Sequence, residues 1–287
     1  MKRIFICTCA VLLSFPVAWA KPVHHPHKTT VSHQHSGSRA HHHSKAAHQG
    51  YGDLNPPQNL SEQSIEVPIN TAAPAPVSGH QYFKWARNVG QGIAALARRT
   101  IQTLHYTNYS LGGSHYDPNR GVYVLDCSDY VDNLINQATP HAYSNLVYNT
   151  GTDKPTTADY YNFFNRLPNA ANNSGWHKVS DVRQVQAGDI LVFRYKSNRH
   201  RYAAGGHVMV VMNAPVRSNN VFLVQVADSA VSGHSQDTRP PHASGIGIGT
   251  LLLKVDPHTE QLAAYSWKMG APWKDNVSFA IGRPISA

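Results

Sequence analysis

The C-terminal half of the chain alternates short apolar runs with polar turns, which is the pattern of β-strands. The runs are rich in Val, Leu, Ile and Phe and are bounded by Gly, Pro, Asn, Asp or Ser. They read DILVFRY (189–195), HVMVVM (207–212), VFLVQVAD (221–228), GTLLLKVD (249–256) and VSFAIGR (277–283). We predict that each run forms a strand.

Two earlier segments carry apolar residues at helical spacing instead. Residues 81–104 present one apolar stripe, which Gly90 and Gly92 interrupt. A second stripe covers residues 131–138 and begins just after Cys127. A helix-rich part followed by several short strands predicts an α+β fold, with N-terminal helices packed on an antiparallel β-sheet.

The first residues, 1–20, have the pattern of a secretory signal peptide. Lys2 and Arg3 precede a short apolar run, and Ala18-Trp19-Ala20 resembles a cleavage site. The run is too short for a transmembrane helix, and no later segment has the roughly 20 apolar residues that a span needs. We therefore expect an exported protein, periplasmic or secreted and associated with the cell wall, with no transmembrane segment.

Between this leader and the folded part lie two segments with little apolar content. Residues 21–50 hold nine of the 19 histidines and no acidic residue, so we expect a disordered basic arm. The arm is either a site for divalent metal ions or a spacer, because its imidazoles have no fixed ligand geometry. Residues 51–78 read as a linker rich in Pro, Ala and Ser, and residues 79–287 as one folded domain.

The charge of the chain favours a polyanionic partner. The sequence has 25 Lys and Arg against 16 Asp and Glu, a net charge of +9. Removal of the leader with Lys2 and Arg3 lowers it to +7. Because export separates the protein from nucleic acid, the cell wall is the expected partner.

A single cysteine remains after the leader is removed, because Cys7 and Cys9 lie within it. In an oxidising compartment a lone thiol is a partner for intermolecular pairing, an inert buried residue or a nucleophile. Asp126 is a good N-cap, so Cys127 stands at the start of the second predicted helix. The helix dipole favours a thiolate there, and backbone N–H groups at this end could bind an oxyanion.

A thiolate nucleophile usually needs a base, and the base needs an orienting partner. His207 follows two glycines and opens a predicted strand, so it is the candidate base. Asp228 ends the next strand and is the candidate partner, with Gln225 as a weaker choice. Asp228 could instead cap the loop that follows it.

The ordered motifs of the chain resemble those of the NlpC-type cell-wall cysteine peptidases. They are YSLGG (109–113), DCS (126–128), GDILVF (188–193) and GGHV (205–208). The resemblance covers most of residues 105–230 and implies a papain-like fold that needs no metal or other cofactor. It further implies a catalytic site of Cys127, His207 and Asp228, an acyl site lined by Tyr109, and placement of the peptide's amino end by Asp126 and Ser128.

The chain departs from this family next to the cysteine. The usual motif is DCSGF, and here Asp129 replaces the glycine, which places a negative charge beside the thiol. Segments 139–187 and 229–287 are longer than the family core needs and are expected to wall the cleft. His200, His234 and Asp237 match no strong zinc pattern, so we interpret them as polar loop residues.

Two functions remain open from the sequence. The first is a peptidoglycan hydrolase that cuts an amide bond of the stem peptide, either the γ-D-glutamyl-diaminopimelate link or the bond between sugar and peptide. The second is a wall-binding or metal-binding module on an inactive scaffold, which Asp129 favours.

Overall fold

The computed structural model describes residues 89–169, 175–196 and 205–285. The predicted leader, arm and linker lie outside these residues, as does the part of the first predicted helix before Val89. The elements are α2 (Val89–Gln102), β1 (Tyr106–Tyr109), β2 (Ser114–Asp117), β3 (Val122–Leu125), α3 (Cys127–Ala138), α4 (Pro140–Thr150), α5 (Thr157–Arg166), β4 (Trp176–Lys178), a 3-10 helix (Val182–Gln184), β5 (Ile190–Tyr195), β6 (Gly206–Val211), β7 (Val216–Ser218), β8 (Val221–Ala230), β9 (Gly245–Val255), β10 (Leu262–Ser266) and β11 (Val277–Pro284).

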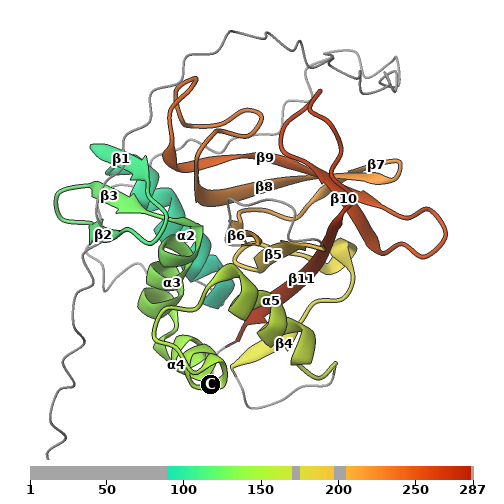
Figure 1. Cartoon of the computed structure of the whole chain (residues 1–287), viewed down its shortest axis with the longest axis horizontal. Coiled ribbons are helices and arrows are strands. Elements are labelled where there is room, and N and C mark those ends of the chain that lie inside the picture. Colours follow the sequence, from blue (N-terminus) through green and yellow to red (C-terminus); the bar gives the residue numbers. More distant parts are fainter. Residues whose placement is uncertain (1–88, 170–174, 197–204, 286–287) are drawn as a thin grey trace, which may run out of the picture. The chain divides into compact units, whose positions relative to one another are not determined.

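The fold is α+β, as predicted, and its main element is an antiparallel sheet (Figure 1). The strand order is β10-β9-β8-β6-β5-β11-β4, and β7 pairs with β8. All of the predicted apolar runs are strands of this sheet, namely β5, β6, β8, β9 and β11. A smaller sheet of order β1-β3-β2 contains a parallel pair, β1 with β3.

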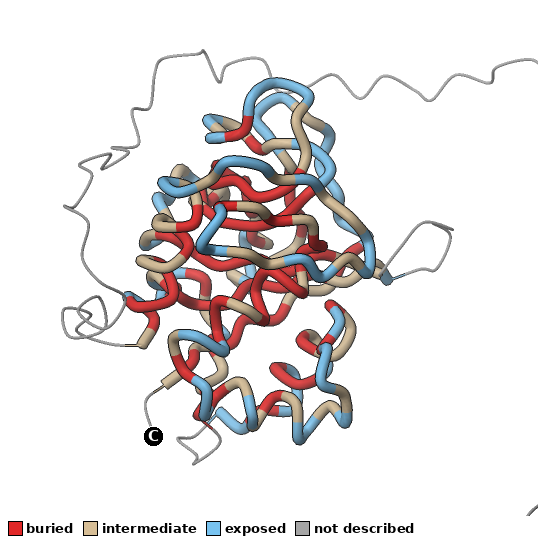
Figure 2. The backbone as a smooth tube through the Cα atoms, turned by 90° about the vertical axis from the view of Figure 1, so that its left-hand side faces the viewer, coloured by how far each residue is buried: buried red, intermediate tan, exposed pale blue. Residues whose placement is uncertain are grey.

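The alternation of side chains along the large sheet fills two cores. On one face, Val208 and Val210 of β6 pack with the helices. On the other face, Met209 and Val211 pack with residues of β8, β9 and β10. The alternating burial of such positions follows from the period of two in a strand. Figure 2 shows buried positions running along the strands and the inner sides of the helices.

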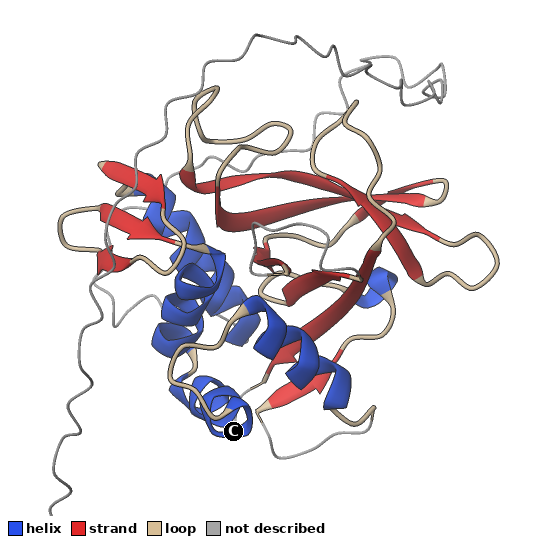
Figure 3. Cartoon of the chain, in the orientation of Figure 1, coloured by secondary structure: helices blue, strands red, loops and turns tan. Residues whose placement is uncertain are grey.

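Helices α2, α3 and α5 lie on the first face, as Figure 3 shows. Over the second face the sheet curls, so that β10 comes against β11. The ring of Tyr265 in β10 stacks on Phe193 in β5 with centroids 4.2 Å apart, and the Tyr195 and Tyr265 hydroxyls are 2.9 Å apart. This curl brings the C-terminal strands to the edge where β6 begins.

Several elements were not predicted, because they lack a one-sided apolar pattern. Strands β1 and β2 contain no fully buried residue, and α4 buries only Ala142 and Leu146. Helix α5 is better marked, since a capping box formed by Thr156 and Asp159 starts it. Among the described residues, no helix is long and apolar enough to cross a membrane.

The glycine that interrupts the first predicted helix has a packing role. Gly90 in α2 lies against Gly188, which precedes β5 and has a φ of +86°. A Cβ at Gly188 would lie 2.1 Å from the Gly90 carbonyl oxygen. Helix and sheet therefore approach closely enough here that Gly188 cannot accept a side chain.

We predict that Gly188→Ala destabilises the protein by several kcal/mol more than Gly151→Ala. Gly151 ends α4 with a φ of +72°, but a Cβ there would meet nothing within 4 Å. Backbone strain at a positive φ costs about 1 to 2 kcal/mol in both variants, whereas only Gly188→Ala forces α2 away from the sheet. Urea unfolding of both variants measures the difference, and equal destabilisation would contradict the close approach.

Candidate active site

Cys127 is the first residue of α3, and the turn before it is fixed by Asp126. The Asp126 carboxylate accepts hydrogen bonds from the backbone N–H groups of Ser128 and Asp129, both at 3.0 Å, and of Gly112, at 3.0 Å. The Ser128 hydroxyl donates to the same carboxylate at 2.8 Å. Asp126 is therefore an N-cap as predicted, while contact of Asp126 and Ser128 with a substrate stays a prediction.

His207 and Asp228 come from neighbouring strands. His207 shares a face of β6 with Met209 and Val211, and Asp228 follows Val224 and Val226 on the same face of the sheet. His207 Nε2 lies 2.6 Å from Asp228 Oδ2. The side chains of the two predicted residues therefore meet at the edge of the sheet.

The side chain of Cys127 lies close enough to His207 for its charge to act on the imidazole. Because Asp228 occupies Nε2, the ring nitrogen left for the sulfur is Nδ1. Burial alone would lower the pKa of His207, but negative charge on Cys127 and the hydrogen bond to Asp228 outweigh it and raise the pKa to about 10. The imidazolium is thus the favoured form of His207 at neutral pH. The three predicted residues lie next to one another in the order Cys127, His207, Asp228.

The thiol itself is covered on the side of α5. Cys127 is 2% exposed, and its sulfur lies 3.7 Å from the hydroxyl oxygen of Thr157, the first residue of α5. No pattern in the sequence indicates Thr157, because this contact joins two helices 30 residues apart. Part of segment 139–187 thus lies beside the thiol, but none of its residues lines the pocket beside His207.

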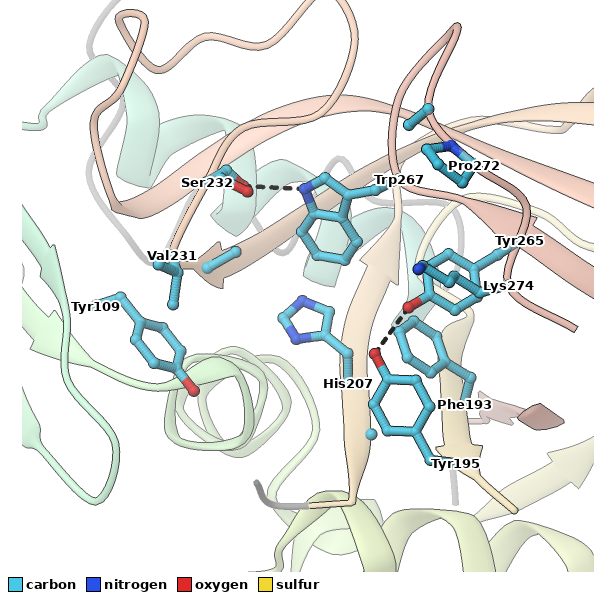
Figure 4. Close-up of a pocket in the computed structure, with 13 residues that line it drawn as sticks. Tyr109, Phe193, Tyr195, His207, Val231, Ser232, Tyr265, Trp267, Pro272 and Lys274 are labelled. Carbon is cyan, nitrogen blue, oxygen red and sulfur yellow. Dashed lines mark hydrogen bonds between the residues drawn. The ribbon is translucent and has the colours of Figure 1, made fainter. Parts of the chain in front are cut away.

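A pocket of about 300 Å³ opens beside His207 (Figure 4). Five of its lining residues are Phe, Tyr or Trp, and residues of the C-terminal segment line one side of it, as expected from the length of that segment. Tyr109 lies across the pocket from Lys274. The lining is Tyr109, Phe193, Tyr195, Gly206, His207, Ala230, Val231, Ser232, Tyr265, Trp267, Ala271, Pro272 and Lys274.

Tyr109 lies close enough to the cysteine and its partners to be affected by their charges. Burial raises the pKa of its hydroxyl to about 12, with further contributions from Cys127, Asp126 and Asp228. Tyr109 therefore keeps its proton at neutral pH and is a hydrogen-bond donor at the pocket wall. The sequence predicted its place in the site, and its contact with a substrate stays a prediction.

Helix α3 carries two more buried carboxyl groups near the thiol. Burial, and then repulsion from Asp126, raises the pKa of Asp129, which Lys154 counteracts from 3.9 Å. Burial raises the pKa of Asp132 to about 8, although Tyr160 donates to its carboxyl oxygen at 2.5 Å. At neutral pH the Asp132 carboxyl is therefore mostly neutral, while Asp129 has Lys154 as its counter-charge.

Two residues interpreted as loop polarity have buried partners instead. His234 and Asp237 lie in the segment after β8, where His234 Nε2 is 2.9 Å from Asp228 Oδ2 and Asp237 pairs with Arg239 at 2.7 Å. Asp228 therefore contacts both His207 and its own loop, and its role in catalysis stays a prediction. His200 lies outside the described residues, within which no group of His, Cys, Asp or Glu side chains is arranged to hold a metal ion.

The shift of Asp132 predicts a pH-dependent stability. The pKa of Asp132 in the folded protein is about 8, above the ordinary value of about 3.9. Its contribution to stability is therefore complete below the ordinary pKa of about 3.9 and is lost as the pH rises toward 8. When the pH rises from 5 to 8, the unfolding free energy of the wild type should fall by about 2 to 4 kcal/mol more than that of Asp132→Asn.

Urea unfolding at the two pH values measures this difference. The exposed Asp153, changed to Asn, serves as the matched control and should behave as the wild type. An Asp132→Asn variant with the wild-type pH dependence would show that Asp132 is ionised in the folded protein.

The sequence of the chain matches no model of a known protein family, and no curated protein is similar to it. The functional interpretation therefore depends on the residues and geometry described above.

Proposed function

We propose that this protein is an exported peptidoglycan hydrolase that cleaves an amide bond of the stem peptide. One observation carries the proposal: Cys127, at the start of α3, lies close enough to His207 for its charge to act on the imidazole, and one ring nitrogen of this imidazole is bound by the buried Asp228. A thiol, an imidazole and a carboxylate in this order make up the machinery of nucleophilic amide hydrolysis.

In the first step the thiolate of Cys127 attacks the amide carbonyl carbon and forms a C–S bond. The carbonyl oxygen becomes an oxyanion that needs donors. Asp126 uses the N–H groups of Ser128 and Asp129, so the N–H of Cys127 is the donor that remains at this helix start. The protonated hydroxyl of Tyr109 is suited to be the second donor.

In the second step the His207 imidazolium gives the proton on Nδ1 to the leaving nitrogen. The C–N bond breaks, the amine departs and a thioester remains on Cys127. Water then attacks the thioester carbonyl while His207 accepts one of its protons. The C–S bond breaks, and the free acid, the thiolate and the imidazolium are restored.

The choice of substrate follows from the sequence. A leader peptide, a net positive charge and the resemblance to NlpC-type peptidases favour the cell wall, and the resemblance favours the γ-D-glutamyl-diaminopimelate bond. Cleavage between sugar and peptide, as by an amidase, is the nearest alternative. Binding of divalent metal ions by the arm, residues 21–50, is a separate proposal on residues that the structure does not describe.

The pocket beside His207 suits one residue of such a peptide. Its aromatic walls accept an apolar stem, and Lys274 supplies a cation at its rim. Diaminopimelate and D-glutamate both carry a free carboxylate that would meet this cation.

A second candidate function is binding of the wall without cleavage. The burial of Cys127, at 2% exposure, favours it, because burial is also the usual condition of an inert thiol. Reaction with iodoacetamide separates the two candidates. A nucleophile reacts faster at pH 6 than a free thiol, whereas an inert thiol reacts only after unfolding.

We predict that Cys127→Ala or His207→Ala lowers the release of soluble peptides from purified sacculi by at least about a thousandfold. The first variant removes the nucleophile, and the second removes the base and acid. Mass spectrometry of the released peptides measures the loss and identifies the bond. His258→Ala, an exposed histidine after β9, is the control and should keep full activity. Undiminished release by either site variant would rule out the mechanism.

We further predict that Lys274→Gln raises the KM for stem peptides about tenfold and leaves kcat unchanged, because the lost ion pair holds substrate and transition state equally. The same variant should not change the KM for a peptide whose carboxylate is amidated. Lys268→Gln, outside the pocket lining, is the matched control. An equal effect of Lys274→Gln on both peptides would show that no carboxylate reaches Lys274.

A further inference from the structure

Asp228 accepts more hydrogen bonds than orientation of His207 requires. Its Oδ2 lies 2.6 Å from His207 Nε2 and 2.9 Å from His234 Nε2, and its Oδ1 accepts from Arg239 Nη2 at 2.9 Å. The side chains of Asp228, His234 and Arg239 are at most 1% exposed. A carboxylate removed from water in this way is stable only with such partners.

Arg239 is itself fixed from several directions. Its Nε and Nη2 donate to the two carboxylate oxygens of Asp237 at 2.8 and 2.7 Å, and its Nη1 donates to the carbonyl oxygen of Gly245 at 2.8 Å. Nη2 also donates to Asp228, so one guanidinium links two buried carboxylates. This planar set of bonds fixes where the positive charge stands relative to Asp228.

The contacts of His234 determine its protonation. Nδ1 lies 3.0 Å from the backbone carbonyl oxygen of Trp267, which can only accept a hydrogen bond, so Nδ1 carries a hydrogen. Nε2 faces Asp228, whose pKa is lowered well below its ordinary range: burial would raise it, but His234, Arg239 and His207 outweigh burial. Because an ionised carboxylate also only accepts, Nε2 carries a hydrogen too. His234 is then an imidazolium.

The charges of this cluster balance. Asp228 and Asp237 contribute two negative charges, and Arg239 and the His234 imidazolium contribute two positive ones. His207 therefore does not face an uncompensated carboxylate, because two cations already share the charge of Asp228. A carboxylate shared in this way attracts a third donor less strongly than a carboxylate alone would.

On this geometry we propose that His234, as an imidazolium, and Arg239 are positioning residues that act on His207 through Asp228. They hold the carboxylate in place and limit how strongly it stabilises the His207 imidazolium through Nε2, so that the imidazolium can release its Nδ1 proton to a leaving amine. The part played in catalysis rests on the proposed function, while the charge state of His234 does not.

The neighbouring strand is shaped to hold this cluster. A Cβ at Gly247 of β9 would lie 2.3 Å from Arg239 Nε, and one at Gly249 would lie 2.5 Å from Asp237 Oδ2. Alternate glycines on one face of β9 thus leave the space that the two side chains occupy. The ring of His234 packs on Trp267 with centroids 4.0 Å apart, which closes the cluster on the side of the pocket.

The charged and titratable groups around His207 all enter the expected pH behaviour. They are Cys127 at the start of α3, Asp228 on β8, Tyr109 on β1, His234, Asp237 and Arg239 in the segment between β8 and β9, and Tyr195, Tyr265 and Lys274 in the pocket lining. Replacing His234 by a neutral residue leaves this set one charge more negative. Extra negative charge favours the protonated forms of both members of the Cys127 and His207 pair, so thiolate is lost at the acid end of the pH range.

The charge state is tested on the full chain at pH 7 by NMR of protein labelled with ¹⁵N-histidine. The His234 ring is assigned by its contact with the Trp267 indole, which requires no variant. Both ring nitrogens are expected to carry hydrogen. A His234 ring with one bare nitrogen at pH 7 would overturn the inference whether or not the protein cleaves peptidoglycan.

The effect on the site is tested by the rate at which iodoacetamide alkylates Cys127, located by mass spectrometry. His234→Gln keeps a donor for Asp228 and removes the charge, and its rate at pH 6 should fall about tenfold with little change at pH 9. His242→Gln, an exposed histidine of the same segment, should react as the wild type. A folded His234→Gln variant with the wild-type rate at pH 6 would overturn the positioning role.

The outcomes separate this inference from the proposed function. If wild-type Cys127 is inert to iodoacetamide and sacculi are not cleaved, the proposed function fails, while the NMR result still decides the charge of His234.

If His234→Gln does not fold, Arg239→Lys provides the second variant, because it keeps the charge and loses the planar set of bonds. Arg239→Lys should slow peptide release and leave the pH dependence of alkylation unchanged, and a shifted pH dependence would contradict the charge argument.

Discussion

The buried carboxylate of Asp228 is the constraint on which the site depends. A fully desolvated charge is tolerated only where donors and opposite charges surround it. Here the donors come from three parts of the chain: His207 from β6, and His234 and Arg239 from the segment between β8 and β9. Satisfying one carboxylate therefore fixes His207, the loop and the edge of the sheet together.

The cysteine side of the site depends on a second carboxylate with a different role. Asp126 is tied to the backbone around it, so it sets the direction in which α3 begins and thus the place of Cys127. The two carboxylates do not compete, because one fixes a helix end and the other a strand end. Cys127 and His207 meet where these two fixed ends come together. The thiol and the imidazole are thus placed side by side by the two carboxylates, and no hydrogen bond between their backbones is needed.

Much of the fold was predictable from local patterns, and so were the three central residues. Strands β5, β6, β8, β9 and β11 each have a buried apolar run, and Asp126 marked the start of α3. The contacts of His234 and Arg239 were not predictable, because they arise only when a loop folds over β9. The alternating glycines of GIGIG (245–249) were the one local signal, since a strand with glycine at every second position leaves space for other side chains.

The compensated charge of Asp228 also bears on its place as the third residue of the proposed site. A lone aspartate would stabilise the His207 imidazolium more strongly than a neutral polar residue would. Two fixed cations withdraw that excess attraction and leave the geometry of the hydrogen bond intact. An aspartate supported by His234 and Arg239 can therefore do the work of a neutral acceptor, provided that the supporting residues keep their charge.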